Sequence, residues 1–135
     1  MIESIGQIAL TVGDIDRSIA FFRDTLGLRF LFSAGPTLAF LDAGGVRLML
    51  SAAEGDFTPV SSTVIYFRVS DLGAEHAAMS SRGATFIDAP HLVATMPDHE
   101  LWMCFVKDPE GNAVGLMEER RARSTTDHEA DRPST

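Results

Sequence analysis

The sequence predicts an α+β fold of two βαβββ modules, whose curved mixed sheets surround a cavity and carry their helices on the outer face. A strand-like segment followed by Asp occurs twice, at 8–14 and 65–71, an offset of 57 residues. Each copy continues into a helical stretch that ends in a glycine, and then into a glycine-centred hairpin, at 40–50 and 105–116. A repeat of this length indicates a duplicated supersecondary unit rather than a solenoid.

In the first module, residues 5–12 alternate and are rich in branched side chains, which predicts a strand. The carboxylate of Asp14 can then cap a helix, because it accepts a hydrogen bond from an unpaired first-turn N–H. Apolar residues recur at helical spacing as far as Leu26, and Gly27 suits the left-handed position after the helix. Three strands are expected to follow, with Gly44–Gly45 as a tight turn, at 28–33, 37–42 and 46–51.

The second module repeats this order of elements. We expect a strand at 63–69, a helix from the Asp71 cap to Ser81, and a strand at 84–88 after Gly83. A longer loop is predicted next, containing Pro90, His91, Pro97 and Asp98. Strands at about 99–107 and 112–118 close the module around an Asp-Pro-Glu-Gly turn at 108–111.

We therefore predict one domain over residues 1–118, because 135 residues suffice for one core of ordinary size. Module one covers 1–51 and module two 63–118, joined by a polar linker at 52–62 that contains Gly and Pro. Residues 119–135 show no apolar periodicity, so they are predicted to form a disordered tail.

Composition excludes several classes of partner. The net charge is −8, with only 11 Lys and Arg, which argues against nucleic acid. The apolar stretches are short and interrupted, so no membrane span is expected. No basic-then-apolar signal region follows Met1, and Cys104 is the only cysteine, so we expect a cytoplasmic protein.

Three features together resemble the vicinal oxygen chelate superfamily over about residues 5–118. They are the duplicated strand-to-Asp pattern, the Leu-Gly pair at 26–27 after the first helix, and the Asp-Pro-Glu-Gly-Asn sequence at 108–112 before the last strand. The superfamily includes glyoxalase I, methylmalonyl-CoA epimerase, extradiol dioxygenases and fosfomycin- and bleomycin-resistance proteins. The resemblance implies a small-molecule ligand and a homodimer, which in some members exchanges modules.

Metal-dependent members of this superfamily hold a divalent ion on equivalent strand positions, which the resemblance places at Gln7, Met49, Val64 and Gly115. Only the Gln7 amide can coordinate a hard cation, so no cofactor is expected. A divalent metal on a displaced site made by His91 and His99 remains an alternative. Because side chains alternate along strands, the positions expected to face the ligand together with Gln7, Met49 and Val64 are Thr11, Arg47, Tyr66, Arg68, Met103, Phe105 and Met117.

Two functions follow from this pattern. The first is a metal-independent binding protein resembling the bleomycin-resistance type, which holds a partly apolar ligand in the cavity between modules. The second is a glyoxalase-like lyase or isomerase in which His99 acts as acid and base and Arg47 or Arg68 stabilises an enolate. For the methionine and phenylalanine side chains, the alternative is that they fill a closed core.

Overall fold

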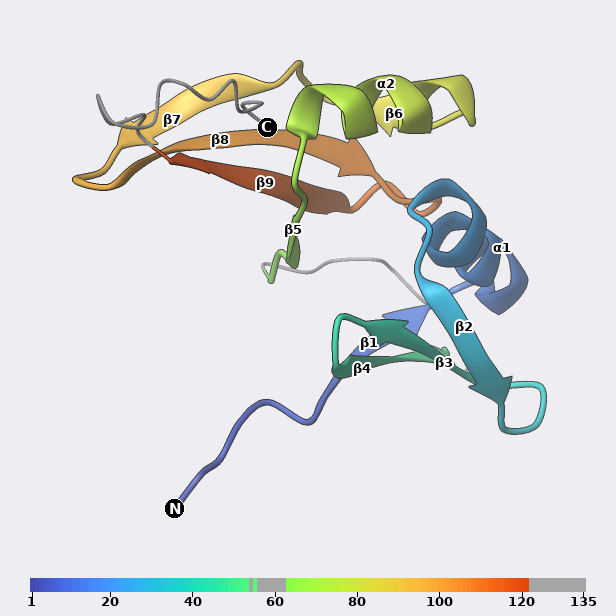
Figure 1. Ribbon diagram of the computed structural model, residues 1–135. Coiled ribbons are helices and arrows are strands. Elements are labelled where there is room, and N and C mark those ends of the chain that lie inside the picture. The colour runs from blue at the N-terminus through green and yellow to red at the C-terminus, as the bar shows by residue number, and fades with distance from the viewer. Residues whose placement is uncertain (54, 56–62, 122–135) are drawn as a thin grey trace. The chain divides into compact units, whose positions relative to one another are not determined.

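The structure is a computed structural model that describes residues 1–53, 55 and 63–121 of the chain (Figure 1). The chain separates into two compact units, Met1–Ser61 with Asp108–Asn112, and Ser62–Lys107 with Ala113–Thr135. Each unit holds one sheet and one helical segment, so the predicted α+β fold is confirmed; the first unit is βαβββ as predicted, and the second has one strand more, β7. In the described part of the chain, no helix is long and apolar enough to cross a membrane.

The first unit contains a four-stranded sheet in the order β1-β4-β3-β2. Strand β1 pairs in parallel with β4, and the other pairs are antiparallel. Alternate residues of β3 and β4 are fully buried on the face that contacts the helix, which makes this face the core. The elements in chain order are β1 (Gln7–Val12), α1 (Ile15–Ala20), the π-helical turn η1 (Phe21–Thr25), β2 (Arg29–Ser33), β3 (Leu38–Ala43) and β4 (Val46–Ala52).

Helix α1 begins as predicted, because Oδ1 of Asp14 accepts a hydrogen bond from the Arg17 N–H at 3.1 Å. A second carboxylate also contacts this end of the helix. Oε2 of Glu110, from the Asp108–Asn112 turn, accepts from the N–H groups of Gly13 and Asp14. After Ala20 the helix widens into η1, and Gly27 at φ 85° then ends it, as expected from its position.

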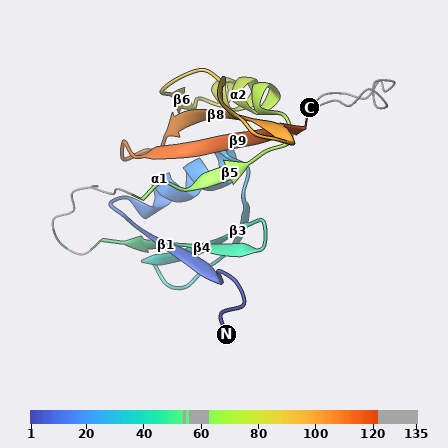
Figure 2. The ribbon, with the colours of Figure 1, turned by 90° about the vertical axis from the view of Figure 1, so that its left-hand side faces the viewer.

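The second unit contains a five-stranded sheet in which β5-β9-β8-β6 are neighbours and β7 pairs with β8. Helix α2 lies on one face of β8 and β9 (Figure 2). The buried side chains on that face include Cys104, Val106 and Leu116, packed with Leu72 and Met79 of the helix. The elements are β5 (Tyr66–Arg68), α2 (Leu72–Ser81), β6 (Thr85–Phe86), β7 (His91–Thr95), β8 (His99–Lys107) and β9 (Ala113–Arg121).

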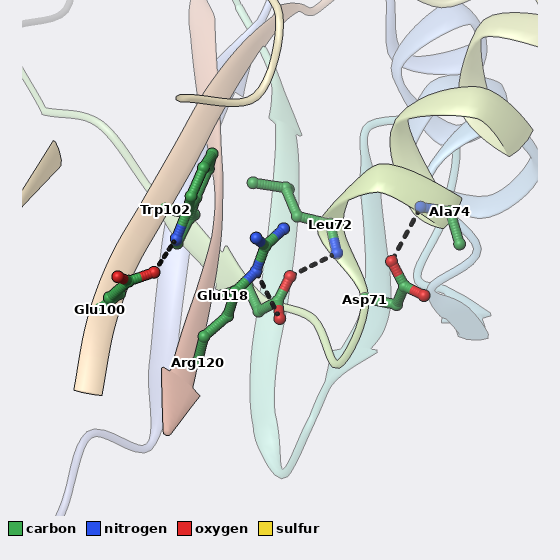
Figure 3. Close-up of polar contacts among 7 residues, drawn as sticks. All are labelled: Asp71, Leu72, Ala74, Glu100, Trp102, Glu118 and Arg120. Atoms are coloured by element: carbon green, nitrogen blue, oxygen red, sulfur yellow. Dashed lines mark hydrogen bonds and ion pairs between the residues drawn. The ribbon is translucent and has the colours of Figure 1, made fainter. Parts of the chain in front are cut away.

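Helix α2 also begins at two carboxylates (Figure 3). Oδ1 of Asp71 accepts from the Ala74 N–H at 3.0 Å, which confirms the predicted cap. Oε1 of Glu118, in β9, accepts from the Leu72 N–H at 2.9 Å, while its Oε2 accepts from Nε of Arg120 at 3.1 Å. Glu118 is only 2% exposed, so a buried side chain of β9 fixes the start of the helix against the sheet.

Two predictions about the second module were wrong. Residues 91–95 form strand β7 where a loop was expected, because Val93 is bulged between the pairs Leu92–Trp102 and Ala94–Leu101 and breaks the alternation. Residues 119–121 belong to β9, although the sequence places them in a disordered tail. Their polar side chains are compatible with a strand because β9 pairs with β8 as far as Arg121. The rest of the predicted tail, and most of the linker, lie outside the described residues.

Candidate functional site

Each sheet has a second face, opposite its helix, and we call it the open face. In the first sheet, the burial of Leu48 and Leu50 on the helix side leaves Arg47, Met49 and Ser51 on the open face. Strand β1 pairs with β4 and contributes the exposed positions Gln7, Ala9 and Thr11. The structure thus puts the predicted site residues Gln7, Thr11, Arg47 and Met49 on one surface.

Gln7, Arg47 and Met49 contact one another directly. Oε1 of Gln7 accepts a hydrogen bond from Nε of Arg47 at 2.8 Å, and Nε2 of Gln7 donates to the Met49 sulfur at 3.7 Å. The Arg47 guanidinium also lies 5.5 Å from the centre of the Phe40 ring. Of the four expected metal positions, only Gln7 has a side chain that could coordinate a metal. Its amide oxygen instead accepts a hydrogen bond from the cationic side chain of Arg47.

The open face of the second sheet is arranged in rows set by strand register. Across β5, β9 and β8 the first row is Tyr66, Gly115 and Phe105. The next row adds β7 and consists of Arg68, Met117, Met103 and His91. The remaining predicted site residues of module two thus lie in these two rows, except Val64, which precedes β5, and His99.

Tyr66 lies so close to Gly115 that no other residue fits at position 115 without movement. A Cβ atom at Gly115 would lie 2.5 Å from Cδ2 and 2.8 Å from Cε2 of Tyr66. The Tyr66 ring also packs edge-to-face on Phe105, with ring centres 5.7 Å apart. An aromatic ring therefore occupies the space that a side chain at the expected metal position 115 would need.

The residues at the four expected metal positions do not fit a divalent cation. Thioether, isopropyl and hydrogen substituents supply no hard donor at Met49, Val64 and Gly115. Within residues 1–53, 55 and 63–121, no group of three or more His, Cys, Asp or Glu side chains is placed to hold a metal ion.

His99 lies away from the aromatic row. It begins β8, six residues from Phe105, so about 20 Å separates the two along the strand. Its Nδ1 donates to Oδ1 of Asp98 at 2.8 Å, and this hydrogen bond holds the pKa of the Asp98 carboxyl below its usual value. The imidazole is 18% exposed. This His–Asp pair could transfer a proton, but only to a group at the far end of the sheet.

His91 and His99 are not brought together. His91 pairs in register with Met103, four residues along β8 from His99, or about 13 Å. Its Nδ1 instead lies 2.9 Å from the Ala89 carbonyl oxygen and 3.5 Å from Oδ2 of Asp88. A displaced metal site made by these two histidines is not supported by this arrangement.

Cys104 and Trp102 lie on the helix face of the second sheet, as their alternation with the site residues predicts. Cys104 is fully buried, and burial raises the pKa of its thiol to about 11. The Trp102 ring is stacked by Arg120, whose guanidinium carbon lies 4.1 Å from the ring centre. Neither side chain reaches the open face, so neither contributes to the candidate site.

Two residues of the open face were missed by the sequence analysis. They are Phe40 and Phe32, whose rings stack with centres 4.7 Å apart. Phe40 is the cross-strand partner of Met49, just as Phe105 is the cross-strand partner of Gly115. Comparison of the two modules strand by strand could have found Phe40, because the repeat relates it to Phe105. Both expected hairpin metal positions thus have a phenylalanine as cross-strand neighbour.

Comparison with known proteins gives matches over almost the whole described chain. A sequence model of the Glyoxalase/Bleomycin resistance protein/Dioxygenase superfamily matches residues 4–116. A lactoylglutathione lyase from Haemophilus influenzae is 31% identical, and the match covers 85% of this chain and 92% of the relative.

Two solved structures illustrate the similarity in fold. A lactoylglutathione lyase from Agrobacterium tumefaciens has a TM-score of 0.68 at 21% identity and covers 87% of this chain and 94% of its own. A glyoxalase/bleomycin resistance protein/dioxygenase from Alicyclobacillus acidocaldarius has a TM-score of 0.69 at 18% identity, with coverages of 86% and 91%.

Proposed function

Since the chain belongs to the Glyoxalase/Bleomycin resistance protein/Dioxygenase superfamily, we propose that it is a metal-independent binding protein of the bleomycin-resistance type. It holds a small, partly apolar molecule against the open faces of its sheets and carries out no chemistry on it. Apolar burial supplies the affinity, and the few polar groups on these faces orient the ligand.

The hydrogen bond between Gln7 and Arg47 carries this proposal. A metal at the expected positions would require the Gln7 oxygen as a ligand, yet that oxygen accepts from a guanidinium at 2.8 Å. A divalent ion placed there would face a fixed positive charge and have one neutral donor. The open face therefore suits an organic ligand better than a cation.

A second candidate is a lyase or isomerase that works without the usual metal site. The Haemophilus influenzae relative, 31% identical, is named a lactoylglutathione lyase, and the His99–Asp98 pair offers an acid–base group. The distance of about 20 Å along β8 from His99 to the aromatic row argues against this role, because a general base must lie within hydrogen-bond reach of its proton.

Metal titration and a lyase assay test the proposal together. We expect calorimetric titration with Zn²⁺ and Ni²⁺ to show no saturable binding, and the chain to show no turnover of lactoylglutathione in either direction. The Haemophilus influenzae lyase serves as the positive control for the assay. Stoichiometric metal binding, or turnover that disappears in His99→Ala, would overturn the proposal in favour of the enzyme.

We also propose that the protein is a cytoplasmic homodimer. The buried thiol of Cys104, the only cysteine, supports a reducing compartment, since it has no partner for an internal disulfide. Light scattering of the full chain at several concentrations tests the dimer, and a monomer mass at all of them would contradict it.

A further inference from the structure

We infer that the ligand bound on the open face of the second sheet is a flat aromatic anion, a fused-ring or conjugated molecule with one carboxylate or similar acidic group. This inference rests on the proposed binding function and adds the chemical class of the ligand. It comes from two features of that face, an aromatic floor made possible by Gly115 and an arginine at its edge.

The floor consists of Tyr66, Gly115 and Phe105. The two aromatic residues lie on strands separated by β9, about 10 Å apart, yet their ring centres are 5.7 Å apart. The Tyr66 ring must therefore lean across Gly115, where the missing Cβ leaves the space. Tyr66 is nevertheless 44% exposed, so its ring remains available for contact.

The floor continues into a second apolar pair. Met117 lies two residues after Gly115 in β9, and Met103 lies two residues before Phe105 in β8, on the same face; both are half-buried. Thioether groups pack favourably against aromatic rings and adapt to irregular shapes. Two aromatic and two methionine side chains together give a surface that suits a flat ring system better than a branched or strongly polar molecule.

Arg68 supplies the preference for a negative charge. It lies on the same face as Tyr66, two residues along β5 or about 7 Å away, within reach of a group attached to a ring on the floor. Arg68 is exposed, and among the described residues its guanidinium makes no hydrogen bond or ion pair. Neither row has an acidic residue at its strand positions. The nearest carboxylates are Asp88, which accepts from the Phe105 N–H and lies beside His91, and the exposed Glu119, which follows Met117 on β9. A planar guanidinium beside an aromatic floor fits a carboxylate through paired N–H donors.

Binding of naphthalene-2-carboxylate to the full-length protein, measured by calorimetry, tests this inference. Its neutral isostere naphthalene-2-carboxamide and the flexible anion octanoate serve as matched probes. We expect the aromatic carboxylate to bind about tenfold more tightly than either, because one charge-assisted hydrogen bond to Arg68 is lost in the first probe and ring contact in the second.

Variants assign these differences to residues. Arg68→Gln should remove the preference for carboxylate over carboxamide, while Arg23→Gln, at an exposed arginine paired with Asp24 in η1, should leave it unchanged. Ring-current shifts in the Met103 and Met117 methyl NMR signals of the unmodified protein should report the bound naphthalene, which keeps the test independent of how the variants fold.

Equal affinity for the carboxylate and the carboxamide, or methyl signals that do not move at saturation, would overturn the inference. Neither result bears on metal binding or turnover, so the metal titration and the lyase assay would still decide the proposed function. Conversely, the protein could bind zinc stoichiometrically and still bind the aromatic carboxylate more tightly than the two probes. That result would overturn the metal-independent function and leave the inferred ligand class in place.

Discussion

Replacement of Glu118 by alanine should destabilise the second unit strongly. The side chain is 2% exposed and accepts hydrogen bonds from the Leu72 N–H at 2.9 Å and from Nε of Arg120 at 3.1 Å (Figure 3). Leu72 itself is fully buried, so its N–H loses its partner where little water can replace it. The perturbation therefore removes a buried carboxylate that fixes the beginning of α2 on β9.

The expected loss follows from these contacts. An unsatisfied buried N–H costs about 1–3 kcal/mol. The Arg120 side chain is 37% exposed, so water compensates much of its lost ion pair, which adds less than about 1 kcal/mol. The sum is roughly 1–4 kcal/mol, which lowers the Tm of a chain of this length by roughly 4–16 °C. Glu118→Gln retains an oxygen that can accept from Leu72, so it should lose about half as much.

Urea unfolding followed by circular dichroism measures these differences, with Glu119→Ala as the matched control. Glu119 is the next residue of β9 and is exposed, so its loss should change the free energy of unfolding by less than about 0.5 kcal/mol. If Glu118→Ala and Glu119→Ala destabilise the protein equally, the buried carboxylate does not fix the helix and the reasoning fails.

Three other changes have predictable outcomes. Gly115→Ala should lose about 1–2 kcal/mol of stability by displacing the tyrosine ring from its aromatic partner, whereas Gly73→Ala, in open helix surface, should gain up to about 1 kcal/mol in the same thermal melts. Asp14→Ala and Asp71→Ala should each lose about 1 kcal/mol in urea titrations, and a negligible loss for both would contradict their capping role. The Cys104 thiol, with a pKa of about 11 in the folded state, should resist alkylation at pH 8 until the protein unfolds. Because that pKa is raised above the ordinary 9.0, its contribution to stability is complete below pH 9 and should decline as the pH rises towards 11.

The local features of the fold were predictable because they depend on neighbouring residues. An Asp before each helix and a glycine after it act within one turn of the chain, and both caps and both positive φ values are present. The long strand β8 was predicted with its observed bounds because its apolar run at 101–106 ends just before the Asp-Pro-Glu-Gly turn at 108–111. Strand β7 was not, since the bulge at Val93 shifts its register relative to β8.

The candidate site was predictable only as a set of strand positions. Alternation put Gln7, Arg47 and Met49 on one face, but the bond between Gln7 and Arg47 joins residues 40 apart in sequence. Glu118 illustrates the same limit, because the sequence placed it only as the last residue of a predicted strand and gave it no partner. Its buried role depends on the Leu72 N–H, which lies 46 residues away.

By itself, the sequence predicted a duplicated βαβββ fold from residue type and spacing. The resemblance to the superfamily implied four metal positions, and the residue types at three of them supply no hard donor. Tertiary structure decided which side chains contact the residues at these positions. Pairing of β1 with β4 brings a guanidinium to the Gln7 oxygen, and pairing of β5 with β9 brings the Tyr66 ring onto Gly115. Spacing along a strand predicts which side chains share a face, but only the pairing of strands decides which of those side chains contact one another.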